Sequence, residues 1–129
     1  MEYQKLWEAA QRVRENAYAP YSEYKVGAAL LSDDGEIYTG CNVENASFPV
    51  TVCAERGALS CAVARGARRF IAIALCAGGQ AVTPCGLCRQ ALAEFGEMDV
   101  LCPDGAGGYR IFLLSELLPH GFSDFREEK

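Results

Sequence analysis

Three cysteines and a glutamate carry the strongest chemical signal in this sequence. Cys85 and Cys88 form a Cys-x-x-Cys pair directly after Pro84, Cys53 lies well upstream, and Glu55 follows Cys53 by two positions. Zinc takes three protein ligands when a water completes its coordination, and a carboxylate beside that water can move its protons. The pattern therefore predicts a catalytic zinc centre on Cys53, Cys85 and Cys88, with Glu55 beside it.

Two other interpretations of the cysteines stay open at this stage. The Cys-x-x-Cys pair could be redox active, although it lacks the first strand-to-helix turn of a thioredoxin-like fold. A structural zinc site would need a fourth ligand, which one of the remaining cysteines could supply: Cys41, Cys61, Cys76 or Cys102. Some of these cysteines are expected to be small buried hydrophobic residues instead. The single histidine, His120, is expected to lie on the surface.

Composition and charge exclude several classes of protein. The chain has 129 residues, half of them hydrophobic, which predicts one catalytic domain over residues 1–129 with a core of its own. Its net charge of −5 disfavours a nucleic-acid partner, because an acidic chain gains nothing from releasing counterions. No segment has the length or apolarity of a membrane helix or a signal peptide, so no membrane partner is expected. Seven cysteines fit a reducing, cytoplasmic location.

Two helices should begin at the cysteine motifs. One is predicted over residues 53–65, with Thr51 as its N-cap and Gly66 at its end. The other is predicted over residues 86–95, ending at Gly96. A helix N-terminus carries free amides and a partial positive charge, which lower the pKa of a thiol there. Two such N-termini facing each other could hold three thiolates around one ion.

Periodicity and turn residues place the other elements. An amphipathic helix of roughly four turns is expected between Tyr3 and Ala17. A short helix over residues 116–118 should be capped by Ser115 and stopped by Pro119. Strands are expected over residues 26–31, 36–43, 70–76, 99–102 and 109–113. This alternation implies an α/β fold, in which helices cover both faces of a sheet that begins with an antiparallel hairpin.

Six motifs spread over most of the chain resemble those of one family. They are YAPYS (18–22), KVGAA (25–29), GCNVENA (40–46), CAER (53–56), PCGLCRQ (84–90) and LLP (117–119) followed by Phe122. On these motifs the chain is similar to the short, homotetrameric, zinc-dependent cytidine deaminases. The resemblance implies a three-layer cytidine-deaminase-like fold, a five-stranded mixed sheet between helices, one Zn²⁺ per subunit, and a homotetramer whose subunits share site residues.

The resemblance also implies roles for the residues around the metal. Glu55 would take a proton from the water that attacks C4 of cytosine, deliver it to ring N3, and help ammonia leave. Arg56 would hydrogen-bond to the cysteine ligands and reduce the charge of three thiolates on one zinc ion. Ala54 would offer backbone groups to the base.

Substrate contacts follow from the same resemblance. Asn42 and Glu44 would bind the ribose hydroxyls, with the carboxylate on the 3′-OH. Tyr24 and Phe122 are candidates for stacking on the base, and Phe122 would come from a neighbouring subunit. The family usually has Phe at the position of Tyr24 and commonly Tyr at the position of Phe48, so both differ here by one hydroxyl. Phe48 is a candidate sugar contact, and Arg89 is expected to be structural.

The sequence thus predicts hydrolytic deamination of free cytidine and 2′-deoxycytidine to uridine and 2′-deoxyuridine, in pyrimidine salvage. One alternative is a deaminase of another aminopyrimidine nucleoside, such as blasticidin S. A second alternative is a zinc-stabilised binding module without catalysis, which would have four protein ligands. A nucleic-acid deaminase is disfavoured, because the chain is acidic and offers no basic channel.

Overall fold

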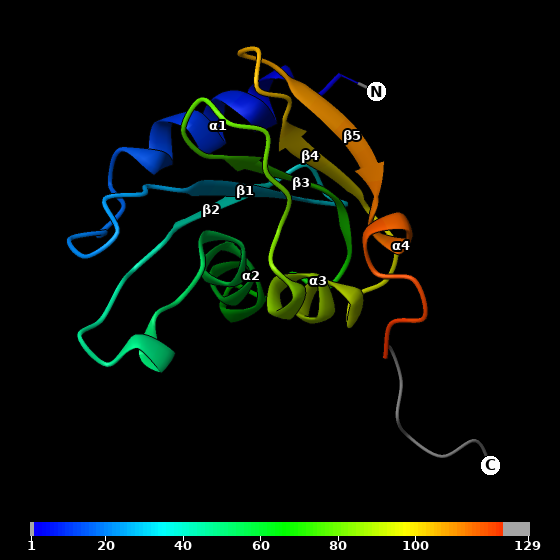
Figure 1. Cartoon of the computed structure of the whole chain (residues 1–129). Coiled ribbons are helices and arrows are strands. Elements are labelled where there is room, and N and C mark those ends of the chain that lie inside the picture. Colours follow the sequence, from blue (N-terminus) through cyan, green and yellow to red (C-terminus); the bar gives the residue numbers. More distant parts are fainter. Residues whose placement is uncertain (1, 123–129) are drawn as a thin grey trace.

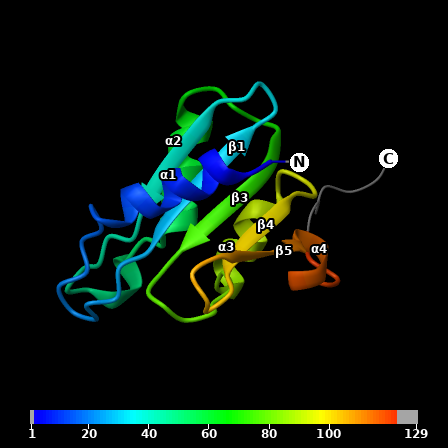
Figure 2. The same cartoon turned by 90° about the horizontal axis from the view of Figure 1, so that it is seen from above.

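The centre of the structure is a five-stranded mixed sheet, which Figures 1 and 2 show from two directions. The computed structural model describes residues 2–122. The strands are β1 (Gly27–Ser32), β2 (Ile37–Cys41), β3 (Phe70–Cys76), β4 (Asp99–Pro103) and β5 (Tyr109–Leu113), in the spatial order β2-β1-β3-β4-β5. Strands β3 and β4 pair in parallel, and the other three pairs of neighbours are antiparallel.

Helices cover both faces of this sheet (Figure 1). Helix α1 (Gln4–Arg14) lies on one face, and α2 (Ala54–Ala64) and α3 (Gly86–Ala93) lie on the other. The short helix α4 (Leu114–Leu117) follows β5, and a 3-10 turn, η1 (Phe48–Val50), precedes α2. The expected three-layer α/β fold with a five-stranded mixed sheet is confirmed. No helix among residues 2–122 is long and apolar enough to cross a membrane.

Strand β3 is the middle strand and is buried almost throughout. Its side chains alternate between two hydrophobic cores, as the pleat of a strand requires. Ile73 packs into the core under α2 and α3, whereas Ala72 and Ala74 pack into the core under α1. A continuous apolar run is what a strand covered on both faces needs, so the sequence prediction for this strand is confirmed.

Two glycines let the helices approach the sheet at backbone distance. A Cβ atom on Gly27 would lie 2.3 Å from the carbonyl oxygen of Ala10 in α1. A Cβ atom on Gly40 would lie 2.3 Å from the amide nitrogen of Ala58 and 2.6 Å from the carbonyl oxygen of Ala54, both in α2. These contacts are too close for any side chain, so glycine at position 40 fixes how near α2 lies to β2.

Two helix starts differ from the sequence prediction. The N-cap of α2 is Cys53 and not Thr51, which instead ends the 3-10 turn η1. Ser115 lies inside α4 rather than capping it, because the Glu116 carboxylate accepts a hydrogen bond from the Leu113 amide (2.7 Å) and fixes the helix start there.

Helix α1 ends at Arg14, before the end that periodicity alone suggested. The helix does not continue to Ala17 because the following segment pairs with the chain after β2. The Tyr18 amide donates to the carbonyl oxygen of Asn42 (2.9 Å), and Tyr18 forms an isolated β-bridge with Val43. Helix α3 likewise ends at Ala93, two residues before the predicted end. The remaining predicted helices and strands agree with the structure to within one or two residues at most ends, which is the usual uncertainty of element boundaries.

Replacing Gly40 with alanine should strongly destabilise the protein. The added methyl group would force α2 away from β2, and overpacking of this kind costs about 3 kcal/mol or more when backbone atoms must move. Gly79→Ala is the matched control, because a Cβ atom there meets no atom within 4 Å. Urea denaturation compares the two; equal free energies of unfolding would show that the contact at Gly40 is not rigid.

Tyr3 predicts a specific loss of stability at alkaline pH. Burial and a 2.7 Å hydrogen bond to Asp99 raise the pKa of Tyr3 from 10.0 to about 12. The folded state therefore holds the phenol proton more tightly than the unfolded state, and this contribution is full below pH 10 and lost as pH rises towards 12. In Tyr3→Phe, the free energy of unfolding should fall less steeply over that range, whereas the exposed-residue control Tyr18→Phe should follow the wild type. Parallel curves for Tyr3→Phe and wild type would contradict the prediction.

Candidate metal and catalytic site

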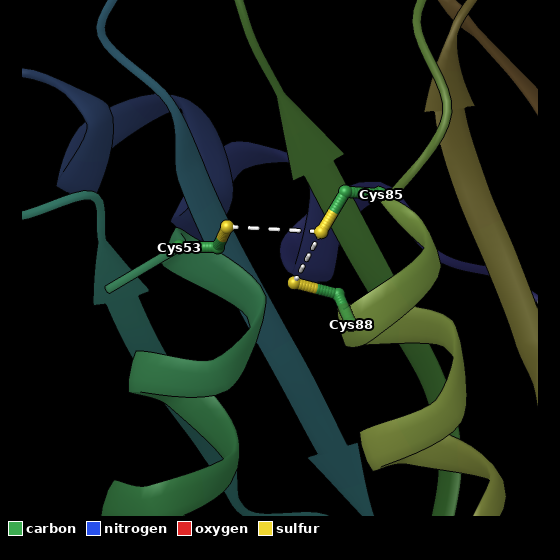
Figure 3. Close-up of side chains that lie close together, drawn as sticks. All are labelled: Cys53, Cys85 and Cys88. Atoms are coloured by element: carbon green, nitrogen blue, oxygen red, sulfur yellow. Dashed lines mark hydrogen bonds between the residues drawn. The ribbon is translucent and has the colours of Figure 1, made fainter. Parts of the chain in front are cut away.

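Three cysteine sulfur atoms meet between the N-termini of α2 and α3 (Figure 3). Cys53 is the N-cap residue of α2, Cys85 is the N-cap residue of α3, and Cys88 lies in the first turn of α3. The sulfur atoms of Cys53 and Cys85 are 3.8 Å apart, and those of Cys85 and Cys88 are 3.4 Å apart. All three lie within 4.8 Å of one another.

This cluster fits one zinc ion. Tetrahedral zinc with Zn–S bonds of about 2.3 Å places its sulfur ligands roughly 3.8 Å apart, close to the separations found here. Within residues 2–122, no fourth cysteine, histidine or acidic side chain joins the three. The other four cysteines are free thiols elsewhere in the fold: Cys41, Cys61, Cys76 and Cys102. Three protein ligands leave a coordination position open, which is typical of catalytic rather than structural zinc.

Hydrogen bonds and a nearby guanidinium favour the thiolate form of Cys53 in this cluster. A hydrogen bond with Cys88 lowers the pKa of Cys53 to about 5, and Arg56 and Cys85 add to this effect. The same hydrogen bond, together with burial, raises the pKa of the Cys88 thiol. Binding of a divalent metal by these cysteines would release thiol protons, so metal affinity would depend on pH.

Arg56 supplies the positive charge beside these thiolates. Its Nη2 donates to the Cys53 sulfur at 3.5 Å, and this bond raises the pKa of Arg56 above its ordinary value. Its Nε is buried and has no hydrogen-bond partner in the described part of the chain. Three thiolates on Zn²⁺ carry a net charge of −1, so one guanidinium at this distance neutralises the centre. Arg56 thus contacts one of the cysteines to which the family resemblance implied a hydrogen bond.

Glu55 lies in the wall of a cavity of about 310 Å³ beside the cluster. Its side chain is 5% exposed, and burial is the main cause that raises the pKa of its carboxyl group to about 7. The nearby Cys53 thiolate contributes to this rise, while a backbone hydrogen bond and Arg56 oppose it. A carboxyl group with this pKa can accept and release a proton near neutral pH, which suits a general acid and base. Cys53 and Cys85 line the same cavity.

Some of the substrate contacts expected from the sequence reach this cavity and others do not. Tyr24, Asn42 and Ala54 line it, together with Val26, Thr51, Leu75, Val82 and Thr83. Glu44 is buried nearby but does not line the cavity. Phe48 and Phe122 are 76% and 65% exposed and do not line it either.

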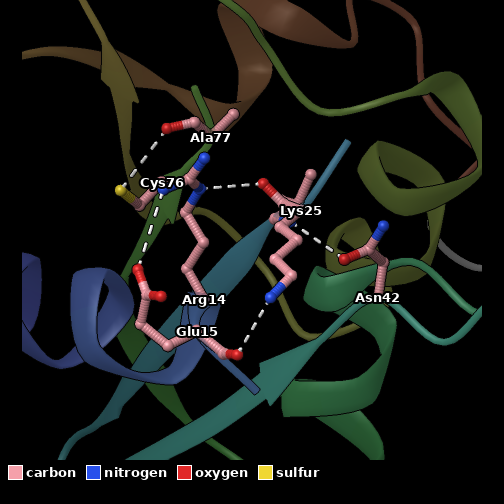
Figure 4. Close-up of polar contacts among 7 residues, drawn as sticks. Arg14, Glu15, Lys25, Asn42, Cys76 and Ala77 are labelled. Carbon is pink, nitrogen blue, oxygen red and sulfur yellow. Dashed lines mark hydrogen bonds and ion pairs between the residues drawn. The ribbon is translucent and has the colours of Figure 1, made fainter. Parts of the chain in front are cut away.

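Asn42 organises the entrance to strand β1 (Figure 4). Its Oδ1 accepts from the Val26 amide (2.9 Å), and its Nδ2 donates to the carbonyl oxygen of Tyr24 (2.8 Å). On the other side of this segment, Arg14 Nε donates to the carbonyl oxygen of Lys25 (2.9 Å). The position of Tyr24 in the cavity wall therefore depends on the amide of Asn42 and on the end of α1.

Glu44 holds the loop that precedes Tyr24. Its Oε1 accepts from the amides of Tyr21 (2.9 Å) and Ser22 (3.1 Å), and its Oε2 accepts from the Ser22 hydroxyl. These bonds, that of the Ser22 hydroxyl above all, lower the pKa of Glu44. Asn42 and Glu44 thus both bind the segment of residues 21–26.

Two site residues have partners that the sequence did not predict. Ser22 binds Glu44, and Gln90 binds both backbone groups of Phe122: its Oε1 accepts from the Phe122 amide (3.1 Å), and its Nε2 donates to the Phe122 carbonyl oxygen. Both residues lie in motifs that mark the family resemblance, YAPYS and PCGLCRQ. The motifs pointed to these segments, but contacts between distant loops leave no periodic signal in the sequence.

Comparison with known proteins gives one consistent result. Residues 1–103 match the family model described as the cytidine and deoxycytidylate deaminase zinc-binding region. A cytidine deaminase from Sporosarcina psychrophila is 46% identical over 126 residues, which cover 95% of this chain and 93% of the relative. One from Halalkalibacterium halodurans is 45% identical, covering 95% and 96%.

Solved structures agree with this result. The crystal structure of cytidine deaminase from Burkholderia pseudomallei has a TM-score of 0.88 and 46% sequence identity, covering 95% of this chain and all of the other. That of cytidine deaminase from Mycobacterium tuberculosis has a TM-score of 0.82 and 40% identity, covering 95% and 98%.

The metal centre predicts which cysteines hold zinc. Replacing Cys53, Cys85 or Cys88 with serine removes one of three thiolate ligands, so zinc per chain should fall from about one to near zero after dialysis against a chelator. Cys61→Ser is the control, because Cys61 lies in α2 outside the cluster, and it should keep its zinc. Atomic absorption measures the metal. Full zinc occupancy in any of the three ligand variants would contradict the assignment.

Proposed function

The chain belongs to the cytidine and deoxycytidylate deaminase family, and we propose that it converts free cytidine and 2′-deoxycytidine into uridine and 2′-deoxyuridine. Water is consumed and ammonia is released. The observation that carries this proposal is the buried carboxyl group of Glu55 beside a three-cysteine cluster, in a cavity large enough for a pyrimidine ring. Relatives that match nearly the whole chain are cytidine deaminases, which supports the same substrate class.

The proposed chemistry divides between the metal ligands and Glu55. Zinc held by Cys53, Cys85 and Cys88 would supply a Lewis acid that makes water acidic near neutral pH. Glu55 takes the proton of the attacking water and passes it to ring N3, while the new C–O bond forms at C4. Its carboxyl group then moves a second proton from the new C4 hydroxyl to the leaving amino group. The C4–N bond breaks, ammonia departs, and the C4 carbonyl of the product forms. Arg56 keeps the thiolate ligands from becoming too electron rich.

We propose that the residues around the cavity recognise the nucleoside. Asn42 and Glu44 bind the ribose hydroxyls, and Tyr24 and the backbone of Ala54 contact the base. Tyr24, Asn42 and Ala54 line the cavity, which supports their part of this assignment. Glu44 reaches a sugar by exchanging part of its bonding to the loop at Ser22.

A homotetramer is proposed on the basis of exposed apolar side chains. Phe48, Leu87 and Phe122 are 76%, 70% and 65% exposed, and large exposed apolar groups mark interaction surfaces. We propose that a second copy of the chain covers them, and that Phe122 of one subunit contacts the substrate of another. Residues 1–129 form one catalytic domain in this proposal. We further propose that the enzyme lies in the cytoplasm, where free thiols persist, and that it serves pyrimidine salvage.

The rival functions receive less support. A zinc-stabilised binding module would use four protein ligands and has no need of a buried acid, yet the described chain brings three cysteines together and buries Glu55 beside them. A deaminase of a modified nucleoside such as blasticidin S would share the metal chemistry and differ at the sugar. Asn42 and Glu44 suit an unmodified ribose, so cytidine remains the favoured substrate.

Glu55→Gln tests the proposed function. The amide keeps the size of the side chain but cannot carry protons, so ammonia release from cytidine should fall by roughly 1000-fold or more, the upper range for loss of a general acid and base. Zinc content and the melting temperature should show that metal and fold persist. Glu36→Gln, at an exposed turn residue, is the control and should retain wild-type turnover. A zinc-loaded wild-type protein that releases no ammonia from cytidine or deoxycytidine would rule out the proposal.

A further inference from the structure

Arg89 forms an unusual set of bonds directly after the metal ligands of α3. Its Nε donates to the carbonyl oxygen of Pro84 (2.7 Å), one of its Nη atoms donates to the Thr83 hydroxyl (2.8 Å), and the other donates to the carbonyl oxygen of Leu117 (2.6 Å). The side chain is half-buried. No carboxylate is among these partners, so the guanidinium is committed to three neutral oxygens.

The loop between β3 and α3, which Arg89 contacts, forms few other hydrogen bonds. Residues 77–85 connect β3 to α3 without a helix or strand and include Gly78 and Gly79. Among hydrogen bonds between described residues, those from Arg89 are the only ones made to residues 78–84. Pro84 has no amide hydrogen, so its carbonyl oxygen is the one backbone group through which this position can be tied.

This segment serves the metal centre and the cavity at once. Cys85 follows Pro84 directly and carries a ligand sulfur, while Val82 and Thr83 line the cavity beside Glu55. A free loop would sample many conformations, and fixing each residue costs about 1–2 kcal/mol in backbone entropy. The hydrogen bonds from Arg89 offset part of that entropy cost. Arg89 can restrain the loop because it lies in the same helix as Cys88.

The hydrogen bond to Leu117 further restrains the Arg89 side chain. Leu117 is the last residue of α4, and a helix C-terminus has free carbonyl groups that favour a cation. The guanidinium therefore joins three parts of the fold: the β3–α3 loop, α3 itself, and the end of α4. Lysine cannot reproduce this arrangement, because an ammonium group is a point charge, whereas the planar fork of arginine reaches several acceptors in fixed directions.

We infer that Arg89 is a positioning residue that fixes residues 83 and 84, and through them the metal ligand Cys85 and the cavity wall. Its effect on substrate binding rests on the proposed function, but its effect on metal retention does not. The carbonyl and hydroxyl oxygens it binds are outside the metal ligand set, so Arg89 acts through the loop rather than on the reacting atoms.

Metal release from the zinc-loaded enzyme tests this inference. Arg89→Met keeps much of the aliphatic stem and removes every donor, so zinc transfer to an excess of a colorimetric chelator should be about tenfold faster than in the wild type. The KM for cytidine should rise by a similar factor, with a smaller change in kcat, because the loosened loop forms part of the binding cavity. Arg89→Lys should lie closer to Arg89→Met than to the wild type.

Arg68→Met is the matched control. Arg68 donates to the carbonyl oxygens of Val63 (3.0 Å) and Ala67 (2.8 Å) at the C-terminal end of α2, away from the cluster. It should lower the melting temperature while leaving zinc release and KM within about twofold of wild type, as expected for a surface site. Equal zinc release and KM in Arg89→Met and wild type, or equal acceleration in Arg68→Met, would overturn the inference. Faster zinc release in an enzyme that does not deaminate cytidine would leave it intact and refute the proposed function instead.

Discussion

The close contact between α2 and β2 is the constraint on which the site depends. Glycine at position 40 lets the backbone of α2 touch the strand, so the start of the helix has little freedom to move. The parallel pairing of β3 with β4 requires a crossover, and α3 provides it on the same face of the sheet. Two helix N-termini therefore meet, and the cysteines at those N-termini come together as a consequence of topology.

Much of this arrangement could be predicted from sequence, because it follows local rules. The apolar run of β3, the antiparallel hairpin of β1 and β2, and the cysteine spacing are all local patterns, and the structure has the strand, the hairpin and the cysteine cluster. Helix ends were less predictable where distant residues decide them. After α1 ends, the Tyr18 amide donates to the carbonyl oxygen of Asn42, which is far away in sequence. The start of α4 is fixed by the carboxylate of Glu116 and not by the hydroxyl of Ser115.

The candidate site divides in the same way. The positions of Cys53, Glu55 and Arg56 depend on one turn of helix, so their types and spacing were informative. Contacts between loops carry no such pattern: the bonds of Ser22 to Glu44 and of Gln90 to Phe122 join residues that are far apart in sequence. Phe48 and Phe122 are exposed at the surface, where a sequence pattern says least about the contacts that a side chain makes.

The bonding of Glu44 sets a condition on its proposed role as a sugar ligand. Its carboxylate already accepts from two amides and a hydroxyl of the neighbouring loop. In the proposed sugar-binding role, a ligand hydroxyl that takes the place of the Ser22 hydroxyl gains only the difference between two similar interactions. The proposed site would then distinguish ligands by whether they replace the hydrogen bond of Ser22. An analogue that displaces the Ser22 hydroxyl without offering a donor leaves the buried carboxylate of Glu44 with one hydrogen bond fewer. In that proposed role, Glu44 would reject the wrong ligand more strongly than it holds the right one.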